Sequence, residues 1–276
     1  MLVVVVMFLF MALLTPLIQD SWSDFVERNG DTVYTRVIFP WAISSLFYWA
    51  YGLLLLFVDF KHIPRLFYQR KYQPKAVMKP EGSIHMPPLR KCLIQVLFNQ
   101  IFVLLPGILF LDWGSRQLGR GIRVDPILPS ISEMLSQGVY GVLLVELFFY
   151  VSHRMLHLQP LYRLIHKQHH EYKAPIALAA IYAHPLEALV GNCLAVIGPA
   201  FVIGFHAYTF YWGICLGFFS TQSSHSGYKI DGRFHDIHHE FTTYNYGSIG
   251  LLDYLLGTFK SITEKDKQST SVQKAE

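Results

Sequence analysis

Charged side chains are scarce in this chain. Only 15% of its 276 residues are Asp, Glu, Lys or Arg, whereas soluble globular proteins carry about 25%. Hydrophobic residues make up 52% and aromatic residues 15%. The formal net charge of +4 is small and dispersed, which argues against a nucleic-acid partner. This composition indicates a membrane protein.

Cysteine is also rare. Cys92, Cys193 and Cys215 are far apart and lie in apolar stretches, which excludes a disulfide framework, a zinc finger and a cysteine-held iron–sulfur cluster. Two metal motifs built on glutamate are missing as well. The chain has neither the His-Glu-x-x-His of zinc hydrolases nor the Glu-x-x-His pairs of soluble di-iron bundles.

Long apolar runs, in contrast, are frequent. A membrane-spanning helix needs about 20 predominantly apolar residues. We expect spans at residues 2–18, 37–58, 92–111 and 134–151, and a tight helical hairpin or re-entrant pair at residues 188–205 and 207–222. The first run lacks a basic region before it, which favours a membrane anchor over a cleaved signal peptide.

The loops between these runs predict the orientation. Residues 59–91 carry eight Lys and Arg, residues 20–36 carry two, and residues 112–130 carry three. Because basic residues favour the cytosolic side, residues 59–91 are expected to face the cytosol. The span that ends at residue 151 then returns the chain to the cytosol, and the hairpin at residues 188–222 begins and ends on that side. Every dense histidine group is therefore expected on the cytosolic face.

Histidine is the unusual residue of this chain, with 13 copies. Eight of them form three groups with the spacings H-x-x-x-H, H-x-x-H-H and H-x-x-H-H: His153, His157, His166, His169, His170, His235, His238 and His239. On a helix, positions i, i+3 and i+4 share one face, so each group is expected to aim two or three imidazoles at one point. Eight imidazoles exceed the need of one four-coordinate zinc and suit two metal ions. The sequence thus predicts an all-α integral membrane protein: a multi-helix transmembrane bundle with a cytosolic, histidine-rich di-metal cap.

Three further residues are candidates for this site. His184 and His225 are each either an additional metal ligand or a partner of one, with a plain hydrogen bond to a backbone carbonyl as the alternative. Glu146 is the one acid in the apolar run before the first group, and it precedes His153 by two helical turns. It is expected to accept an N–H from a metal-bound imidazole, or else to be a polar residue facing a cavity in the protein.

These motifs, in this order within an apolar chain, resemble the fatty acid hydroxylase / sterol desaturase superfamily. The resemblance covers roughly residues 138–258, and further matching stretches are Ala174-Pro175, Tyr182-Ala-His-Pro-Leu-Glu187, Ser224-His-Ser-Gly-Tyr228, Asn245-Tyr-Gly247 and Leu252-Asp-Tyr-Leu-Leu-Gly-Thr258. The Ala-His-Pro-Leu-Glu stretch looks most like the 4-methyl sterol oxidase branch.

The resemblance implies two iron ions, O₂, and electrons from NAD(P)H through cytochrome b5. It also implies that the ligands are the eight histidines of the three groups, with His184 and His225 as additions, and that the protein resides in the endoplasmic reticulum membrane. The His-Pro-Gly-Gly motif of a fused cytochrome b5 domain is absent, so a separate donor and its reductase are expected. Residues 59–91 are a candidate docking face for that acidic donor, but the ordinary excess of basic residues on the cytosolic side is the favoured explanation of their charge.

The resulting hypothesis is an O₂-dependent lipid oxygenase of sterol biosynthesis, with the lipid held in a slot among the helices. The alternatives are a fatty acyl or sphingolipid hydroxylase or desaturase, and a catalytically inactive metal-binding membrane protein. We divide the chain into N-terminal membrane helices with a basic loop at 1–130, a catalytic domain at 131–260, and a disordered tail at 261–276.

Overall fold

The computed structural model describes residues 2–71, 88–172, 176–230 and 234–261, and only the backbone of residues 2–12. In these parts every regular element is a helix, and the sole β-pairings are two isolated bridges. The prediction of an all-α protein is confirmed. Lys75, Lys79, residues 174–175 and the predicted tail from residue 262 lie outside the described residues.

Four helical segments are long and apolar enough to cross a membrane: Tyr34–Lys61, Leu89–Gln117, Ile131–Leu156 and Pro185–Ile203. Their elements are η1 (Tyr34–Ile38) with α2 (Phe39–Lys61); α4 (Leu89–Asn99), η2 (Gln100–Leu104) and α5 (Leu105–Gln117); α6 (Ile131–Leu156); and α8 (Pro185–Glu187), η5 (Ala188–Ile197) and α9 (Gly198–Ile203). Each segment contains most or all of one predicted span, so the chain is a multi-pass membrane protein. Large apolar side chains such as Leu54, Phe57, Phe102 and Phe110 are exposed on the outside of the bundle, where they suit the lipid.

Two other helices fall on predicted spans. The run at residues 2–18 lies within α1 (Leu2–Asn29), and its role as a span stays a prediction. The second arm of the predicted hairpin is α10 (Ala207–Ser224), which is helical but is not among the four candidate spans. The chain turns between α9 and α10 at Gly204, whose φ of +78° favours glycine.

Three of the spans contain a π-helical stretch at the same place relative to a proline. The stretches η1, η2 and η5 end two residues before Pro40, Pro106 and Pro199 respectively. Proline has no N–H, and its ring crowds the carbonyl four residues earlier, so a wider turn relieves that contact. The prolines therefore account for the irregular turns without interrupting the spans.

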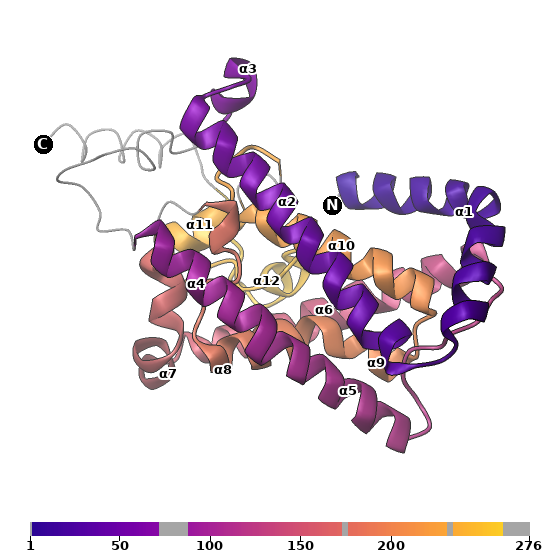
Figure 1. Cartoon of the computed structure of the whole chain (residues 1–276). Helices are drawn as coiled ribbons and strands as arrows, with labels where there is room; N and C mark the ends of the chain where they lie inside the picture. Colours follow the sequence, from indigo (N-terminus) through magenta and orange to yellow (C-terminus); the bar gives the residue numbers. More distant parts are fainter. Residues whose placement is uncertain (1, 72–87, 173–175, 231–233, 262–276) are drawn as a thin grey trace, which may run out of the picture.

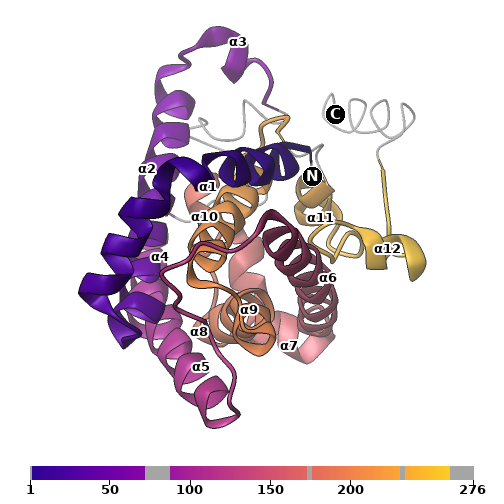
Figure 2. The same ribbon diagram turned by 90° about the vertical axis from the view of Figure 1, so that its right-hand side faces the viewer.

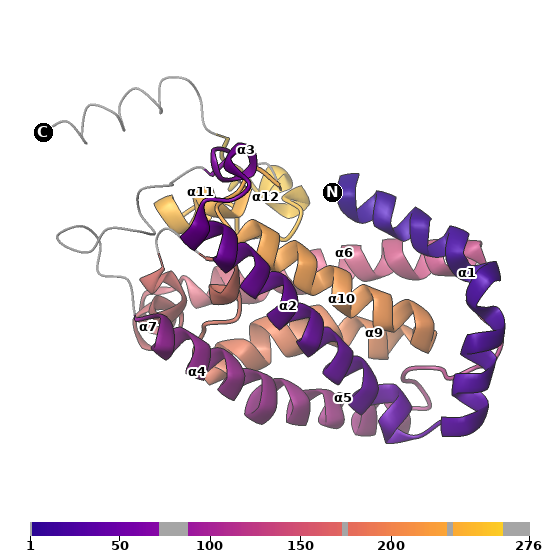
Figure 3. The same ribbon diagram turned by 45° about the horizontal axis from the view of Figure 1, so that its top comes forward.

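Packing within the bundle brings the functional elements to one end. Helix α2 packs along α10, and α6 packs against η5 and α9. Figure 2 shows α9 and α10 in the middle, with α2 and α5 on one side and α6 on the other. The short elements α7 (Gln159–Leu164), η3 (His166–Glu171), α11 (Phe234–Phe241) and α12 (Leu251–Leu255) gather at the end where α2 and α6 finish (Figures 1 and 3).

One basic residue of the predicted docking segment has a structural role. Lys71 is buried, and its Nζ lies 2.5 Å from Oδ1 of the buried Asp59. The same carboxyl oxygen accepts the hydroxyl of Tyr228 at 2.6 Å. Burial lowers the pKa of Lys71, whereas the charge of Asp59 opposes this shift. Lys71 is thus not available to a docking partner, while Lys61, Arg65, Arg70, Arg90 and Lys91 remain exposed.

Candidate metal centre

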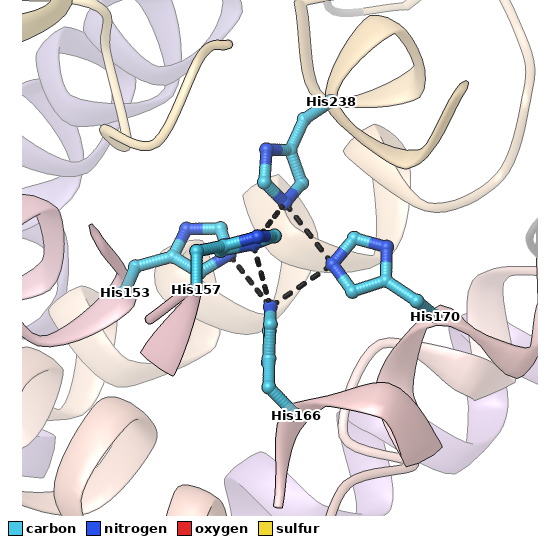
Figure 4. Close-up of side chains that lie close together, drawn as sticks. All are labelled: His153, His157, His166, His170 and His238. Atoms are coloured by element: carbon cyan, nitrogen blue, oxygen red, sulfur yellow. Dashed lines mark hydrogen bonds between the residues drawn. The ribbon is translucent and has the colours of Figure 1, made fainter. Parts of the chain in front are cut away.

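Five histidines form the first group. Two come from the end of α6, two from η3 and one from α11: His153, His157, His166, His170 and His238. Their Nε2 atoms point toward one another, as Figure 4 shows. The Nε2 of His166 lies at the hub, 3.1 Å from that of His153 and 2.9 Å from those of His157 and His170. The Nε2 of His238 closes the group at 3.2 Å from those of His157 and His170.

Four histidines form a second group beside the first. They are His169 of η3, His225 at the C-terminal cap of α10, and His235 and His239 of α11. The Nε2 of His225 lies 3.1 Å from that of His169 and 3.0 Å from that of His235. The two groups are adjacent, because the rings of His170 and His239 have their centroids 4.8 Å apart.

The two H-x-x-H-H motifs each serve both groups: two imidazoles of each motif aim at one group, as expected, and the third belongs to the other group. In η3 the outer pair, His166 and His170, joins the first group, and His169 joins the second. In α11 the outer pair joins the second group and His238 joins the first. In the α-helix α11, helical geometry accounts for this division: at about 100° per residue, position i+4 lies about 40° from i, whereas i+3 lies about 60° away on the other side. The stretch η3 is a 3-10 helix, so its division comes from the way it packs against α11 and not from α-helical spacing.

The hydrogen bonds of the Nδ1 atoms indicate which ring nitrogen is free. Nδ1 of His225 lies 2.7 Å from the carbonyl of Thr221, and Nδ1 of His169 lies 3.3 Å from that of Tyr182. A carbonyl only accepts, so each Nδ1 carries the proton and each Nε2 is left with a lone pair. His153 and His238 are fixed in the same way, by the carbonyls of Tyr246 at 2.8 Å and Tyr244 at 2.7 Å.

A cation fits between these lone pairs. The Nε2 atoms of His169 and His225 face each other at 3.1 Å without a proton to share, which is unfavourable unless both bind a positive ion. Two nitrogens that bind one ion at about 2.1 Å and at a right angle lie about 3.0 Å apart. His239 is buried, and among the described residues neither of its ring nitrogens has a hydrogen-bond partner. The donor set therefore fits two metal ions that accept imidazole.

The protonation state of the site also suits metal binding. Burial lowers the pKa of His157 and of His169 to about 4, and that of His225 to about 3. For His235, His238 and His239, burial together with the neighbouring histidines holds the pKa well below 6.5. These imidazoles are neutral at pH 7, and the neutral form is the one that binds metal.

Glu146 has a different role from the predicted one. It is buried and accepts hydrogen bonds from the backbone N–H groups of Ser248, Ile249 and Leu252 and from the Ser248 hydroxyl. It does not accept from His153, because the Tyr246 carbonyl already occupies that position. Glu146 instead anchors the loop that supplies this carbonyl. Spacing on α6 could not reveal this, since the loop comes about 100 residues later.

His184 does not join either group among the described residues. Its Nδ1 accepts the backbone N–H of Leu186 at 3.2 Å and so caps the start of α8. Its role as a metal ligand has no support from the geometry. The same stretch supplies a residue that the sequence prediction missed, because the Glu187 side chain, three positions further on, reaches the site.

A small cavity of about 30 Å³ adjoins both groups. Its polar lining comes from His153, His166, His169, His225, His235, Glu187, Asn192 and Thr221, and its apolar lining includes Phe149, Leu156 and Ala180. This volume holds one or two water-sized molecules, so the expected lipid slot is not open here. A larger apolar groove of about 550 Å³ lies between α1, α2 and α10 and has no histidine in its lining.

Comparison with known proteins agrees with this site. A family model described as fatty acid hydroxylase matches residues 138–258, which contain all nine clustered histidines. The chain is 37% identical over 221 residues to fatty acid hydroxylase domain-containing protein 2 of Macaca fascicularis, covering 78% of this chain and 64% of that protein. It thus spans less than two thirds of the length of that relative.

Two other relatives match over most of their length. A putative methylsterol monooxygenase of Dictyostelium discoideum is 31% identical over 255 residues, covering 87% of this chain and 89% of that protein. Very-long-chain aldehyde decarbonylase GL1-11 of Oryza sativa subsp. japonica is 31% identical over 227 residues, covering 74% and 84%. No solved structure matches the chain. By these similarities and its histidine centre, the chain belongs to the fatty acid hydroxylase family.

Proposed function

We propose that this protein is a membrane-bound, non-haem di-iron oxygenase that oxidises a C–H bond of a lipid with O₂. The proposal rests mainly on one observation: nine histidines converge in two adjacent groups, with buried lone pairs that face one another. Imidazole is a ligand that iron accepts readily, and two groups imply two ions. The ligands would be the five histidines of the first group for one iron and the four of the second for the other.

Iron bound at this centre would activate O₂ for removal of hydrogen from the lipid, a chemistry that amino-acid side chains lack. The residues of the protein hold the ligands in place and limit the water beside them. Backbone carbonyls hold His153, His169, His225 and His238 in the tautomer that leaves Nε2 free. The apolar side chains of Phe149 and Leu156 line the cavity and limit the water beside both groups.

The position of the metal centre in the bundle supports a proposal for the side of the membrane on which the reaction takes place. The elements that carry the histidines lie at one end of the spans (Figure 3), and we propose that an apolar lipid approaches the centre there from the bilayer. We assign this end to the cytosolic side, because residues 59–91 are rich in Lys and Arg. The endoplasmic reticulum is proposed as the membrane from the resemblance to the family. Electrons then come from NAD(P)H through a separate cytochrome b5.

A sterol is the proposed substrate, in a reaction like that of 4-methyl sterol oxidase in sterol biosynthesis. The similarity to a putative methylsterol monooxygenase over 89% of its length supports this choice. The alternative is oxidation of a fatty acyl or sphingoid chain, in keeping with the aldehyde decarbonylase relative. Comparing the lipids of cells with and without the protein separates the two, because 4-methyl sterols accumulate only if the sterol is the substrate.

The direct test compares two variants that each remove one imidazole at the same end of the protein. His169→Ala removes a member of the second group. His62→Asn is the control, because His62 lies outside both groups and has a left-handed φ of 57° that asparagine tolerates. Bound iron and O₂-dependent lipid oxidation in membranes are expected to fall in His169→Ala and to persist in His62→Asn. Equal product from both variants would reject the proposal.

A further inference from the structure

Glu187 places a carboxyl group beside the hub of the first group. Its Oε1 lies 2.8 Å from Nδ1 of His166, a close approach outside the angle of a regular hydrogen bond. The other ring nitrogen of His166 is the one that contacts His153, His157 and His170. Glu187 thus contacts His166, whose Nε2 lies closest to three of the other four histidines of the first group.

This arrangement differs from that of other histidines at the centre. His153, His169, His225 and His238 each direct Nδ1 toward a neutral backbone carbonyl. A carboxylate 2.8 Å from Nδ1 carries a negative charge that a carbonyl lacks, and this charge makes the opposite ring nitrogen a better electron donor. His166 is therefore set apart as the imidazole with an ionisable partner.

The second carboxyl oxygen of Glu187 also indicates that this side chain lies beside a positive charge. Oε2 is buried and has no hydrogen-bond partner in the described part of the chain, and the residue is only 6% exposed. An unpaired buried carboxyl oxygen is costly unless a positive charge lies close by. Glu187 also lines the small cavity that adjoins both groups. Two cations held by the histidines would supply that positive charge.

We propose that Glu187 is a positioning residue that fixes His166 and lowers the reduction potential of the metal pair. This inference rests on the proposed iron centre. Nine neutral imidazoles add no charge to two metal cations, so one adjacent carboxylate changes the charge of the site considerably. A negative charge stabilises the more positive, oxidised form of the pair, and its removal raises the midpoint potential.

Glu187→Gln tests this charge while keeping the shape of the side chain. We expect a more positive midpoint potential in a spectroelectrochemical titration of the iron-loaded protein, and a 10- to 100-fold loss of iron affinity, about the effect typical of removing a partner of a metal-bound histidine. Glu187→Asp is expected to keep the potential nearer that of the unchanged protein, because the charge is retained.

Glu133→Gln is the matched control. It makes the same substitution near the other end of α6, about 30 Å along the helix from His153, and is expected to leave the potential and iron affinity unchanged. If Glu187→Gln also leaves both unchanged in a protein that binds two irons, the inference is wrong and the proposed function stands. If the unchanged protein binds no iron, the proposed function itself fails.

Discussion

Replacing Glu146 by glutamine is expected to loosen the metal centre from a distance. The carboxylate accepts hydrogen bonds from the N–H groups of Ser248 at 2.7 Å and of Ile249 and Leu252 at 2.9 Å, and from the Ser248 hydroxyl at 2.9 Å. A glutamine has one acceptor oxygen. If this oxygen keeps the three bonds now made by Oε2, the amide NH₂ faces the N–H of Leu252, and two donors meet.

The magnitude follows from these contacts. A hydrogen bond to a charged group contributes about 1.5–3 kcal/mol, and a buried donor without a partner costs about 1–3 kcal/mol. These two effects describe partly the same loss, so we expect Glu146→Gln to lower the free energy of unfolding by about 2–4 kcal/mol. The loop that Glu146 anchors carries the Tyr246 carbonyl, which holds His153. Bound metal is therefore expected to fall as well.

Thermal unfolding in detergent, with metal content measured on the same samples, tests this reasoning. Glu133→Gln again serves as the control, because the partly exposed pair of Glu133 and Arg123 contributes less than about 1 kcal/mol. If Glu146→Gln unfolds at the same temperature as the control and keeps its metal, the loop does not depend on this carboxylate.

Three further outcomes follow from the structure. Gly247→Ala would place a Cβ 2.6 Å from Oε1 of Glu146, which is held by its own hydrogen bond, so a loss of about 1–3 kcal/mol in thermal unfolding is expected; an unchanged unfolding temperature would contradict it. His184→Ala is expected to retain bound metal and His225→Ala to lose it, because only His225 belongs to a group; elemental analysis that gave the reverse order would show that the grouping is wrong. Since burial lowers the pKa of His225 from 6.5 to about 3, the unfolded chain binds protons below pH 6.5 that the folded chain does not. The metal-free protein should therefore lose stability as the pH falls from about 6.5 toward 3, and a flat unfolding profile between pH 7 and 5 would refute this.

The sequence by itself determined the class of protein and the residue type at its centre. Low charge and long apolar runs are properties of composition, and the partitioning of apolar residues into lipid needs no knowledge of the fold. The eight grouped histidines were equally visible, because each group is local in the chain. His225 was identifiable only as a candidate, since a single histidine at the end of an apolar run resembles many others.

Only the tertiary structure decided how the histidines are divided between the two groups. The division into five and four histidines depends on the relative rotation of η3 and α11, which packing sets and local spacing does not. Glu146 and Glu187 received their roles from loops and helices distant in sequence. His184 and Glu187 are three residues apart, yet the carboxylate reaches the centre whereas the imidazole caps its own helix. Hydrophobic patterning determines which segments enter the membrane, but side-chain direction at the end of each helix determines the chemistry of the site.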